Sequence, residues 1–339
     1  MISWQLWDGA SEKWDELLYS LSDNTVFQSF AWGEYKKGKG WTPARYFCVD
    51  IMGQKYAIAQ ILIMKLPFGM AFIWIPGGPV FEFVGFKNIE VAELSNKLIC
   101  KIREDYPRSL IRFNCLREND YNLSCEFDKF FFKPYVQLNS GFTVQMKLSE
   151  SVVMMRNNMT SKHRYYTKKA TEKGLSWHVG NTDQQLIILD SMCSEMVKNK
   201  KLSYSVCNLE ELINMRDHMG DSVLVLTGFL DQKPVASCLV LLSGKKAFYM
   251  TASASNIGRE VSASYAMFEK LMQLLVEWGI SDFDFGGIDL VKKSAAGVNH
   301  FKIGFGGKVI EYFGEWESAS SRTVRVLINL AIGLKIGRR

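Results

Sequence analysis

Residues 283–316 combine side chains that could do chemistry with glycines that allow backbone to approach a ligand closely. Asp284 lies in a short aromatic stretch that is typical of a strand, and Gly286–Gly287 follows it directly. Phe301–Lys302 comes after a polar loop, just before a second pair of glycines. Glycine accepts positive φ and close contact, which other residues resist. A strand end, a glycine break and a lysine beside an aromatic ring predict a functional site here.

The same stretch of sequence contains two kinds of acid–base group. Asp282 and Asp284 are two residues apart on the expected strand, so they share a face and could act as a pair. The alternative is that one of them orients the glycine turn. His300 could serve as a base, but the residues equally fit a solvated loop histidine.

The segment Val152–Lys173 is dense in positive charge and predicts a helix or a broken pair of helices. Two tyrosines are interleaved with its cations, and one acid lies among them. A solvated basic face is the usual fate of such a run, whereas this density favours anion binding. Arg164 is the preferred phosphate ligand because its guanidinium can donate in a fork. The basic residues are Arg156, Lys162, His163, Arg164, Lys168, Lys169 and Lys173.

A second group of aromatic and basic residues lies near the N-terminus, in residues 26–41. It includes Trp41, and Lys36 is one of three lysines among the aromatic side chains. One interpretation is a helix end with packed rings and solvated lysines. The other is the wall of a phosphate-sugar pocket, with Lys36 on the anion. The residues alone leave both open.

Length, hydrophobic content, net charge and cysteine spacing limit the kind of protein this can be. The chain has 339 residues, 47% of them hydrophobic, which predicts two domains with ordinary cores. A net charge of +6 fits an anionic partner such as tRNA or a phosphate-bearing substrate. Seven cysteines without CxxC spacing indicate a reducing compartment; Cys48, Cys100, Cys115 and Cys238, in apolar runs, are expected to be buried.

Several motif classes are missing from the sequence. It shows no metal-binding spacing, P-loop, GxGxxG or nucleophile elbow, so we expect no metal and neither redox chemistry nor phosphoryl transfer. It has no signal-peptide pattern and no uninterrupted apolar run of membrane-spanning length. Ser320–Arg339 has five basic residues, no acid and an apolar helical stripe. We expect it to pack on the first domain; a membrane-surface helix is the alternative.

Hydrophobic periodicity predicts an α/β fold built from two related modules. In the second, a strand at Ala247–Ala252 precedes a loop at Ser253–Val261, a helix at Ser262–Trp278 and the strand with the glycine break. This order is typical of the acyl-group cradle of the GNAT fold. The free N–H groups at the start of that helix would face an anion or a polarised carbonyl.

The sequence resembles a known family, the FemABX aminoacyltransferases. The resemblance rests on Asp284-Phe-Gly-Gly-Ile288, Phe301-Lys302, Gly306-Gly-Lys-Val and Tyr312-Phe-Gly-Glu315, with weaker matches in the same order along the chain. It implies two tandem GNAT-like domains with mixed sheets flanked by helices. The expected division is 1–145 plus 317–339 for precursor binding, and 146–316 for acyl or aminoacyl transfer. The coiled-coil insertion of some members has no counterpart here.

The resemblance also implies an activity and site residues. Family members move an amino acid from aminoacyl-tRNA to the interpeptide branch of a peptidoglycan precursor, without a covalent intermediate. It places Phe301 and Lys302 at the reaction centre, Lys36 and Arg164 on the precursor's diphosphate, and Tyr249 in a wall of the same channel. Trp41 and Lys168 are further candidate substrate-binding residues. One departure matters: Arg112-Phe113-Asn114 stands where some members have Arg-Phe-Asp, so we assign no base in the first domain.

The implied partners are aminoacyl-tRNA and a UDP- or lipid-linked envelope precursor, with no separate cofactor. We expect a cytoplasmic monomer, with peripheral contact at the inner membrane as an alternative. Two rival functions remain open: an acyl-CoA-dependent N-acyltransferase acting on a surface-polysaccharide amino sugar, and a non-catalytic module that binds precursor or tRNA. CoA-using GNAT proteins favour a [RQ]xxGx[GA] loop, which residues 256–264 lack.

Overall fold

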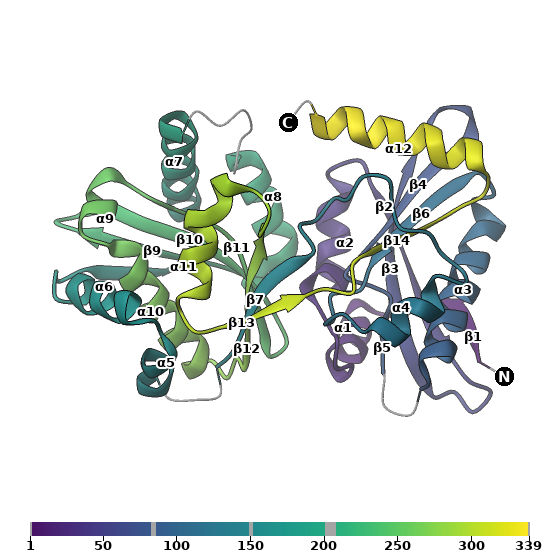
Figure 1. Ribbon diagram of the computed structural model, residues 1–339, viewed down its shortest axis with the longest axis horizontal. Coiled ribbons are helices and arrows are strands. Elements are labelled where there is room, and N and C mark those ends of the chain that lie inside the picture. Colours follow the sequence, from purple (N-terminus) through teal and green to yellow (C-terminus); the bar gives the residue numbers. More distant parts are fainter. Residues whose placement is uncertain (1, 83–85, 149–151, 201–207, 338–339) are drawn as a thin grey trace. The chain divides into compact units, whose positions relative to one another are not determined.

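The structure, a computed structural model, describes residues 2–82, 86–148, 152–200 and 208–337 (Figure 1). The chain forms two compact units. Unit 1 comprises Met1–Gly141 and Glu311–Arg339, and unit 2 comprises Phe142–Ile310. The expected boundaries lay a few residues further along at both junctions. Strand hydrogen bonds run along a whole strand, so the strands that begin at Phe142 and Glu315 each belong entirely to one sheet.

The sheet of unit 1 has the order β1-β2-β3-β4-β6-β14, with β5 also paired to β3. Only β4 and β6 run parallel among the pairs described in this sheet. β3 is buried continuously from Ala57 to Ile63, and this stretch of its sequence is apolar except at Gln60. The strands are β1 Ser3–Leu6, β2 Thr42–Val49, β3 Lys55–Lys65, β4 Ala71–Pro76, β5 Val80–Phe81, β6 Ser109–Asn114 and β14 Glu315–Ala319.

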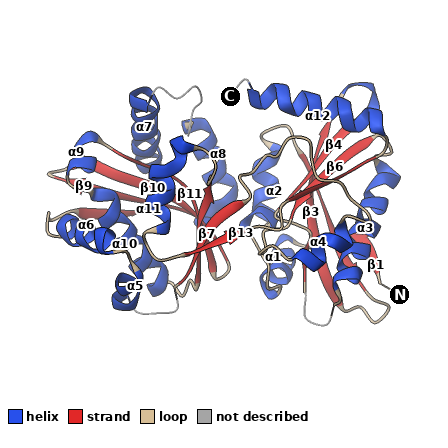
Figure 2. Cartoon of the chain, in the orientation of Figure 1, coloured by secondary structure: helices blue, strands red, loops and turns tan. Residues whose placement is uncertain are grey.

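Helices cover both faces of this sheet (Figure 2). Ile73 and its neighbours pack against the apolar stripe of α3, whereas Phe72 points the other way and packs against α12. Adjacent strand residues point to opposite faces, so α3 and α12 lie on opposite sides. α12 packs on unit 1, as expected from its sequence. The helices are α1 Ser11–Ser20, α2 Phe30–Lys37, α3 Asn88–Asp105, α4 Tyr121–Phe127 and α12 Arg322–Gly337.

The sheet of unit 2 has the order β13-β7-β12-β11-β10-β9-β8, with β11 and β12 parallel. Its strands are β7 Phe142–Lys147, β8 Ser176–Gly180, β9 Val223–Leu230, β10 Lys233–Ser243, β11 Lys246–Ala254, β12 Asp282–Ile288 and β13 Lys308–Glu311. Its helices are α5 Val152–Asn158, α6 Ser161–Thr171, α7 Asp183–Lys200, α8 Leu209–Met219, α9 Asn256–Glu260, α10 Ala263–Glu277 and α11 Ala296–Ile303.

The two units share one topology, which confirms the predicted α/β fold with two mixed sheets. In each, two antiparallel strands lead to a parallel pair joined by a crossover helix, α3 between β4 and β6 and α10 between β11 and β12. An antiparallel strand then flanks the second parallel strand: β14 in unit 1 and β7 in unit 2. A parallel pair requires such a crossover, because the chain must return to the same end of the sheet.

Several local expectations were wrong. The loop expected at Ser253–Val261 contains α9, and Phe301–Lys302 lies on α11 instead of following a loop. Cys100 is exposed on α3, whereas Cys48, Cys115 and Cys238 are buried as expected; Cys207 lies outside the described residues. Among the described helices, none has both the length and the apolar content that crossing a bilayer would need.

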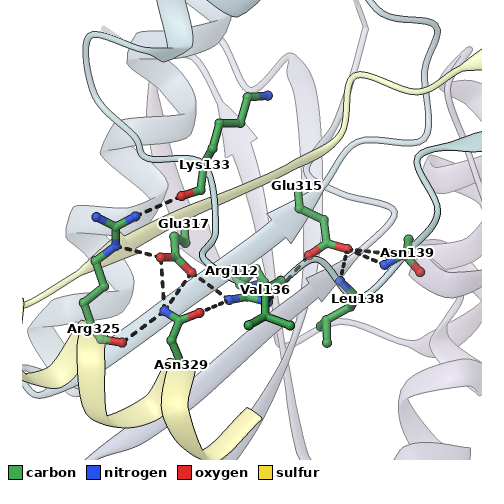
Figure 3. Close-up of polar contacts among 9 residues, drawn as sticks. All are labelled: Arg112, Lys133, Val136, Leu138, Asn139, Glu315, Glu317, Arg325 and Asn329. Atoms are coloured by element: carbon green, nitrogen blue, oxygen red, sulfur yellow. Dashed lines mark hydrogen bonds and ion pairs between the residues drawn. The ribbon is translucent and has the colours of Figure 1, made fainter. Parts of the chain in front are cut away.

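A buried network of charges joins α12 to the sheet of unit 1 (Figure 3). Arg112 on β6 is fully buried and donates to the carboxylate of Glu317 on β14 at 2.8 Å. The same carboxylate accepts from Arg325 at 2.7 Å and from Asn329 at 3.1 Å, both on α12. Nearby, burial raises the pKa of Glu315 despite the positive charge of Arg112. The network fixes where α12 crosses the sheet.

Removing the charge at the centre of this network should be costly. Glu317→Gln leaves the Arg112 guanidinium buried without its closest anion, and we expect the free energy of unfolding of unit 1 to fall by about 3 kcal/mol. Urea denaturation followed by tryptophan fluorescence would measure it. The control is Glu104→Gln, which breaks the exposed Lys101–Glu104 pair and should cost less than about 1 kcal/mol. Equal losses would contradict the role given to the network.

Candidate active site

A bulge in β12 creates the local geometry of the candidate site. The register of β12 against β7 shifts between Asp284 and Gly287. Gly286 within the bulge has a φ of 72°, and a Cβ there would lie 3.0 Å from the backbone oxygen of Tyr249. Other residues resist this conformation, so the glycine break seen in the sequence is required by the backbone.

Asp284 holds the bulge in shape. Its carboxylate accepts from the backbone N–H of Gly286 at 2.7 Å and from the amide of Gln145 at 3.1 Å. It also accepts from the hydroxyl of Thr143. Of the two sequence interpretations, orienting the glycine turn is the one these contacts support. Its role in proton transfer stays a prediction. The neighbouring Asp282 forms an ion pair with Lys147.

Lys302 brings a cation to the same bulge. Its ammonium group, on α11, donates to the carbonyl of Gly287 at 2.8 Å. Burial lowers the pKa of Lys302 to about 8, and the negative charge of Asp284 opposes that shift only in part. Lys302 and Asp284, which the sequence proposed as candidates 18 positions apart, therefore come together across the bulge. A lysine with this pKa carries a charge at neutral pH that its surroundings solvate poorly.

Phe301 anchors α11. Its ring packs against Tyr265 and Phe305, with ring centroids 5.3 and 5.0 Å away. Its backbone carbonyl accepts from Nε2 of His163 at 3.0 Å. Phe301 thus has a clear structural task next to Lys302, and its direct part in the reaction stays a prediction.

His163 connects α6 to α11, a role that sequence reasoning missed. A carbonyl can only accept, so Nε2 carries the ring proton, and Nδ1 then accepts from the hydroxyl of Thr160 at 2.8 Å. Burial lowers the pKa of His163, which favours this neutral form. No pattern in the sequence marks this role, because His163 lies in a run of basic residues. The expected loop residue His300 lies on α11, with its ring 5.4 Å from that of His163.

The ring of Tyr249 packs in the core of unit 2. Its centroid lies 6.0 Å from that of Phe268 and 6.1 Å from that of Phe283. Burial raises the pKa of Tyr249 well above its usual value. The side chain nearest the bulge on β11 is Phe248: a Cβ on Gly286 would lie 3.6 Å from its ring and 3.8 Å from the nitrogen of Lys302. A substrate role for Tyr249 stays a prediction.

The basic segment forms two helices, α5 and α6, as the broken-pair alternative expected. Arg164 donates to the backbone carbonyl of Asn157 at 3.1 Å and to that of Met159, so its guanidinium binds the end of α5. Phosphate binding would require it to leave these carbonyls or to use its remaining N–H groups. Lys168 lies one turn further along α6 and is exposed. The role of both residues in binding the precursor stays a prediction.

Lys36 and Trp41 lie in unit 1. The nitrogen of Lys36 lies 4.5 Å from the ring centroid of Trp32, a cation–π contact. The ring of Trp41 packs 5.9 Å from that of Phe72, beside α12. Asn114, at the position where some members of the family that the sequence resembles have aspartate, accepts from the backbone N–H of Gly77 at 2.8 Å and so holds a turn. Within the described residues, no three His, Cys, Asp or Glu side chains gather as a metal site would require.

The model of the FemAB family matches residues 214–331, a segment that contains the bulge and α11. Over this segment the chain is similar to the FemAB family, in agreement with the resemblance drawn from the sequence. The aminoacyltransferase FemA of Staphylococcus epidermidis is 27% identical over 123 residues. The match to FemA covers 35% of the present chain and 30% of FemA, so the chain spans under a third of the length of that relative.

Solved structures extend the likeness to the whole fold. The crystal structure of FemX has a TM-score of 0.84 at 16% identity, covering 96% of this chain and all of FemX. A tandem GNAT protein from the clavulanic acid biosynthesis pathway has a TM-score of 0.53 at 6% identity, covering 95% of this chain and 99% of its own. At these identities the likeness concerns the fold alone. It confirms the predicted tandem GNAT-like architecture.

The contact between His163 and α11 can be tested through Gly304. A Cβ at Gly304 would lie 1.9 Å from the His163 ring, so Gly304→Ala must displace the ring or α11. We expect a loss of about 1–3 kcal/mol in the free energy of unfolding, measured by urea denaturation. Gly297→Ala on the same helix is the matched control, because nothing lies within 4 Å of its Cβ, and it should be neutral or slightly stabilising. A neutral Gly304→Ala would contradict this packing.

Proposed function

We propose that this protein is a member of the FemABX family and an aminoacyltransferase that moves an amino acid from aminoacyl-tRNA to an amine of a peptidoglycan or other cell-envelope precursor. The observation that carries the proposal is the position of Lys302, a poorly solvated cation held at a glycine bulge beside Asp284. Such a cation is suited to stabilise negative charge that develops on a substrate. The FemAB family model matches residues 214–331, the segment in which this lysine lies.

The chemistry needs little from the protein besides alignment and charge stabilisation. An aminoacyl ester is already activated, so the acceptor amine attacks its carbonyl carbon directly and forms the new C–N bond. The carbonyl oxygen becomes an oxyanion that Lys302 stabilises. As the intermediate collapses, the ester C–O bond breaks and the ribose hydroxyl leaves with a proton. The amine loses a proton to a nearby base, for which Asp284, His300 and solvent remain the candidates.

The remaining candidate residues supply binding. Lys36, Arg164 and Lys168 carry the positive charge that the phosphates of a UDP- or lipid-linked precursor would need, and Trp41 offers aromatic surface. Tyr249, whose ring packs against the core of unit 2, stays a candidate. No cofactor beyond the donor substrate is required. The donor is a cytoplasmic molecule, which supports action in the cytoplasm or at the inner face of the membrane. We propose a monomer.

The alternative donor is an acyl-CoA, and the likeness in fold to a tandem GNAT protein is the reason to consider it. The loop between β11 and α10 weighs against it. This loop lacks the pattern that CoA-using GNAT proteins favour, and most of it is folded as α9. Gly258 of α9 packs so closely on β10 that a Cβ would lie 1.8 Å from the backbone oxygen of Val235. We therefore favour aminoacyl-tRNA as the donor.

A donor competition tests the proposal. Purified protein would receive aminoacyl-tRNA labelled in its amino acid, or labelled acyl-CoA, together with UDP-linked and lipid-linked precursors bearing free amines. We expect label to move from tRNA to an acceptor amine. Label moving only from CoA would establish the rival function. Binding of tRNA or precursor without transfer from either donor would establish a non-catalytic module.

The charge on Lys302 gives a pH signature. Because its pKa is lowered to about 8, the cation is present below that pH and is lost as pH rises through it. Transfer, corrected for spontaneous ester hydrolysis, should therefore decline above about pH 8. Lys302→Arg keeps a cation throughout, so its decline should move to higher pH even if its rate is low.

Removing the Lys302 cation altogether should lower the rate of transfer more than raising the pH does. Lys302→Ala should lower the rate of transfer by roughly 10²–10³-fold, because the oxyanion loses its charged partner. Lys293→Ala, an exposed lysine in the segment before α11, is the matched control and should leave the rate unchanged. Both variants should keep the circular dichroism of the parent protein. Unchanged turnover in Lys302→Ala would remove Lys302 from the reaction.

A further inference from the structure

Helix α12 has two apolar faces, and only one of them packs on the sheet. Val324 and Ile328 are buried against Phe72 and Leu110. A second row of side chains points away from that core: Val326 is 37% exposed, Leu327 49%, Leu330 59% and Leu334 66%. Leu327, Leu330 and Leu334 follow each other at helical spacing and therefore form one stripe.

The turn between β3 and β4 adds a second apolar element beside α12. Leu66 and Met70, at either end of this turn, pack into the core formed by Val324 and Ile328. Phe68 lies between them, with its side chain 81% exposed and a φ of 61°. Figure 1 shows α12 lying across the part of unit 1 that contains β4 and β6. An exposed ring at the tip of a turn and an exposed leucine stripe thus lie on one side of unit 1.

Positive charge surrounds these apolar groups. Arg322 and Lys335 are exposed on α12, and Lys65 is exposed at the start of the turn. Arg108 is also exposed, and its carbonyl accepts from the N–H of Ala71 at 3.0 Å, which places it at the base of the same turn. From Ser318 to its end the chain has no acidic residue. A surface with apolar side chains in the middle and cations around them matches an anionic bilayer, which offers acyl chains below a layer of negative charge.

We propose that α12 and the β3–β4 turn dock unit 1 on an anionic lipid surface. Phe68 and the leucines enter the boundary between headgroups and acyl chains, and the four cations contact lipid phosphates. The docking is peripheral, because the opposite face of α12 is occupied by the core of unit 1. This inference goes beyond the proposed transfer reaction and does not depend on it, although an acceptor linked to a lipid would lie at the same surface.

Sedimentation with lipid vesicles tests the proposal on the full chain. We expect the protein to bind vesicles that contain phosphatidylglycerol and phosphatidylcholine, and to bind pure phosphatidylcholine far more weakly. The variant Leu330→Ser/Leu334→Ser, and separately Phe68→Ser, should lower the vesicle partition coefficient by about tenfold or more. The matched control is Ile51→Ser/Met52→Ser, since these residues are 83% and 88% exposed on the turn at the other end of β3. The control should bind as the parent does.

Three results would overturn the proposal. One is a parent protein that ignores anionic vesicles, which would follow if other parts of the chain cover the stripe. Another is an equal loss of binding in the Ile51/Met52 control. The third is a leucine-dependent dimer in sedimentation velocity without lipid, which would make the stripe an interface between two copies. Transfer to a water-soluble acceptor should be the same in all these variants, so a failure of membrane docking is distinguishable from a failure of the transfer function.

Discussion

The hydrogen bond between the Lys302 ammonium and the Gly287 carbonyl is the contact on which the candidate site depends. A lysine normally keeps its charge in water, where it is well solvated. Here burial lowers its pKa to about 8, and the bulge supplies a carbonyl in place of water. The bulge in turn requires glycine at position 286, where φ is 72°. The bulge and the poorly solvated cation therefore form a single arrangement, because the bulged backbone supplies the carbonyl that the Lys302 ammonium binds.

Much of what surrounds Lys302 holds α11 and the bulge in place. Phe301 contributes its ring to an aromatic cluster and its carbonyl to His163. Gly304 allows the His163 ring to pack directly on the helix backbone. Asp284 satisfies the N–H of Gly286 and keeps the strand bulged. Reaction rates are sensitive to small displacements of a catalytic group, so such positioning residues serve function as much as stability.

Unit 1 uses buried charge for a comparable purpose. The Arg112–Glu317 pair, with Arg325 and Asn329, attaches α12 at one place on the sheet through hydrogen bonds of defined direction (Figure 3). A purely apolar contact would allow the helix to slide or rotate. The fixed rotation of α12 decides which of its apolar residues face the core and which face outward. The outward leucine stripe is thus a consequence of the network on the other side of the helix.

The sequence by itself determined the α/β class, the tandem modules and most of their strands, because alternating and helical hydrophobic patterns are local properties. It also singled out the stretch that contains the candidate site, since Gly286–Gly287 and Lys302 differ visibly from core-forming sequence. It could not show that Arg164 binds the carbonyls at the end of α5, or that Phe301 and His163 lock two helices together. These partners are distant in sequence or hidden among similar residues. Only the tertiary structure decided them, because the pairing of polar groups depends on which backbone segments the fold brings into hydrogen-bonding range.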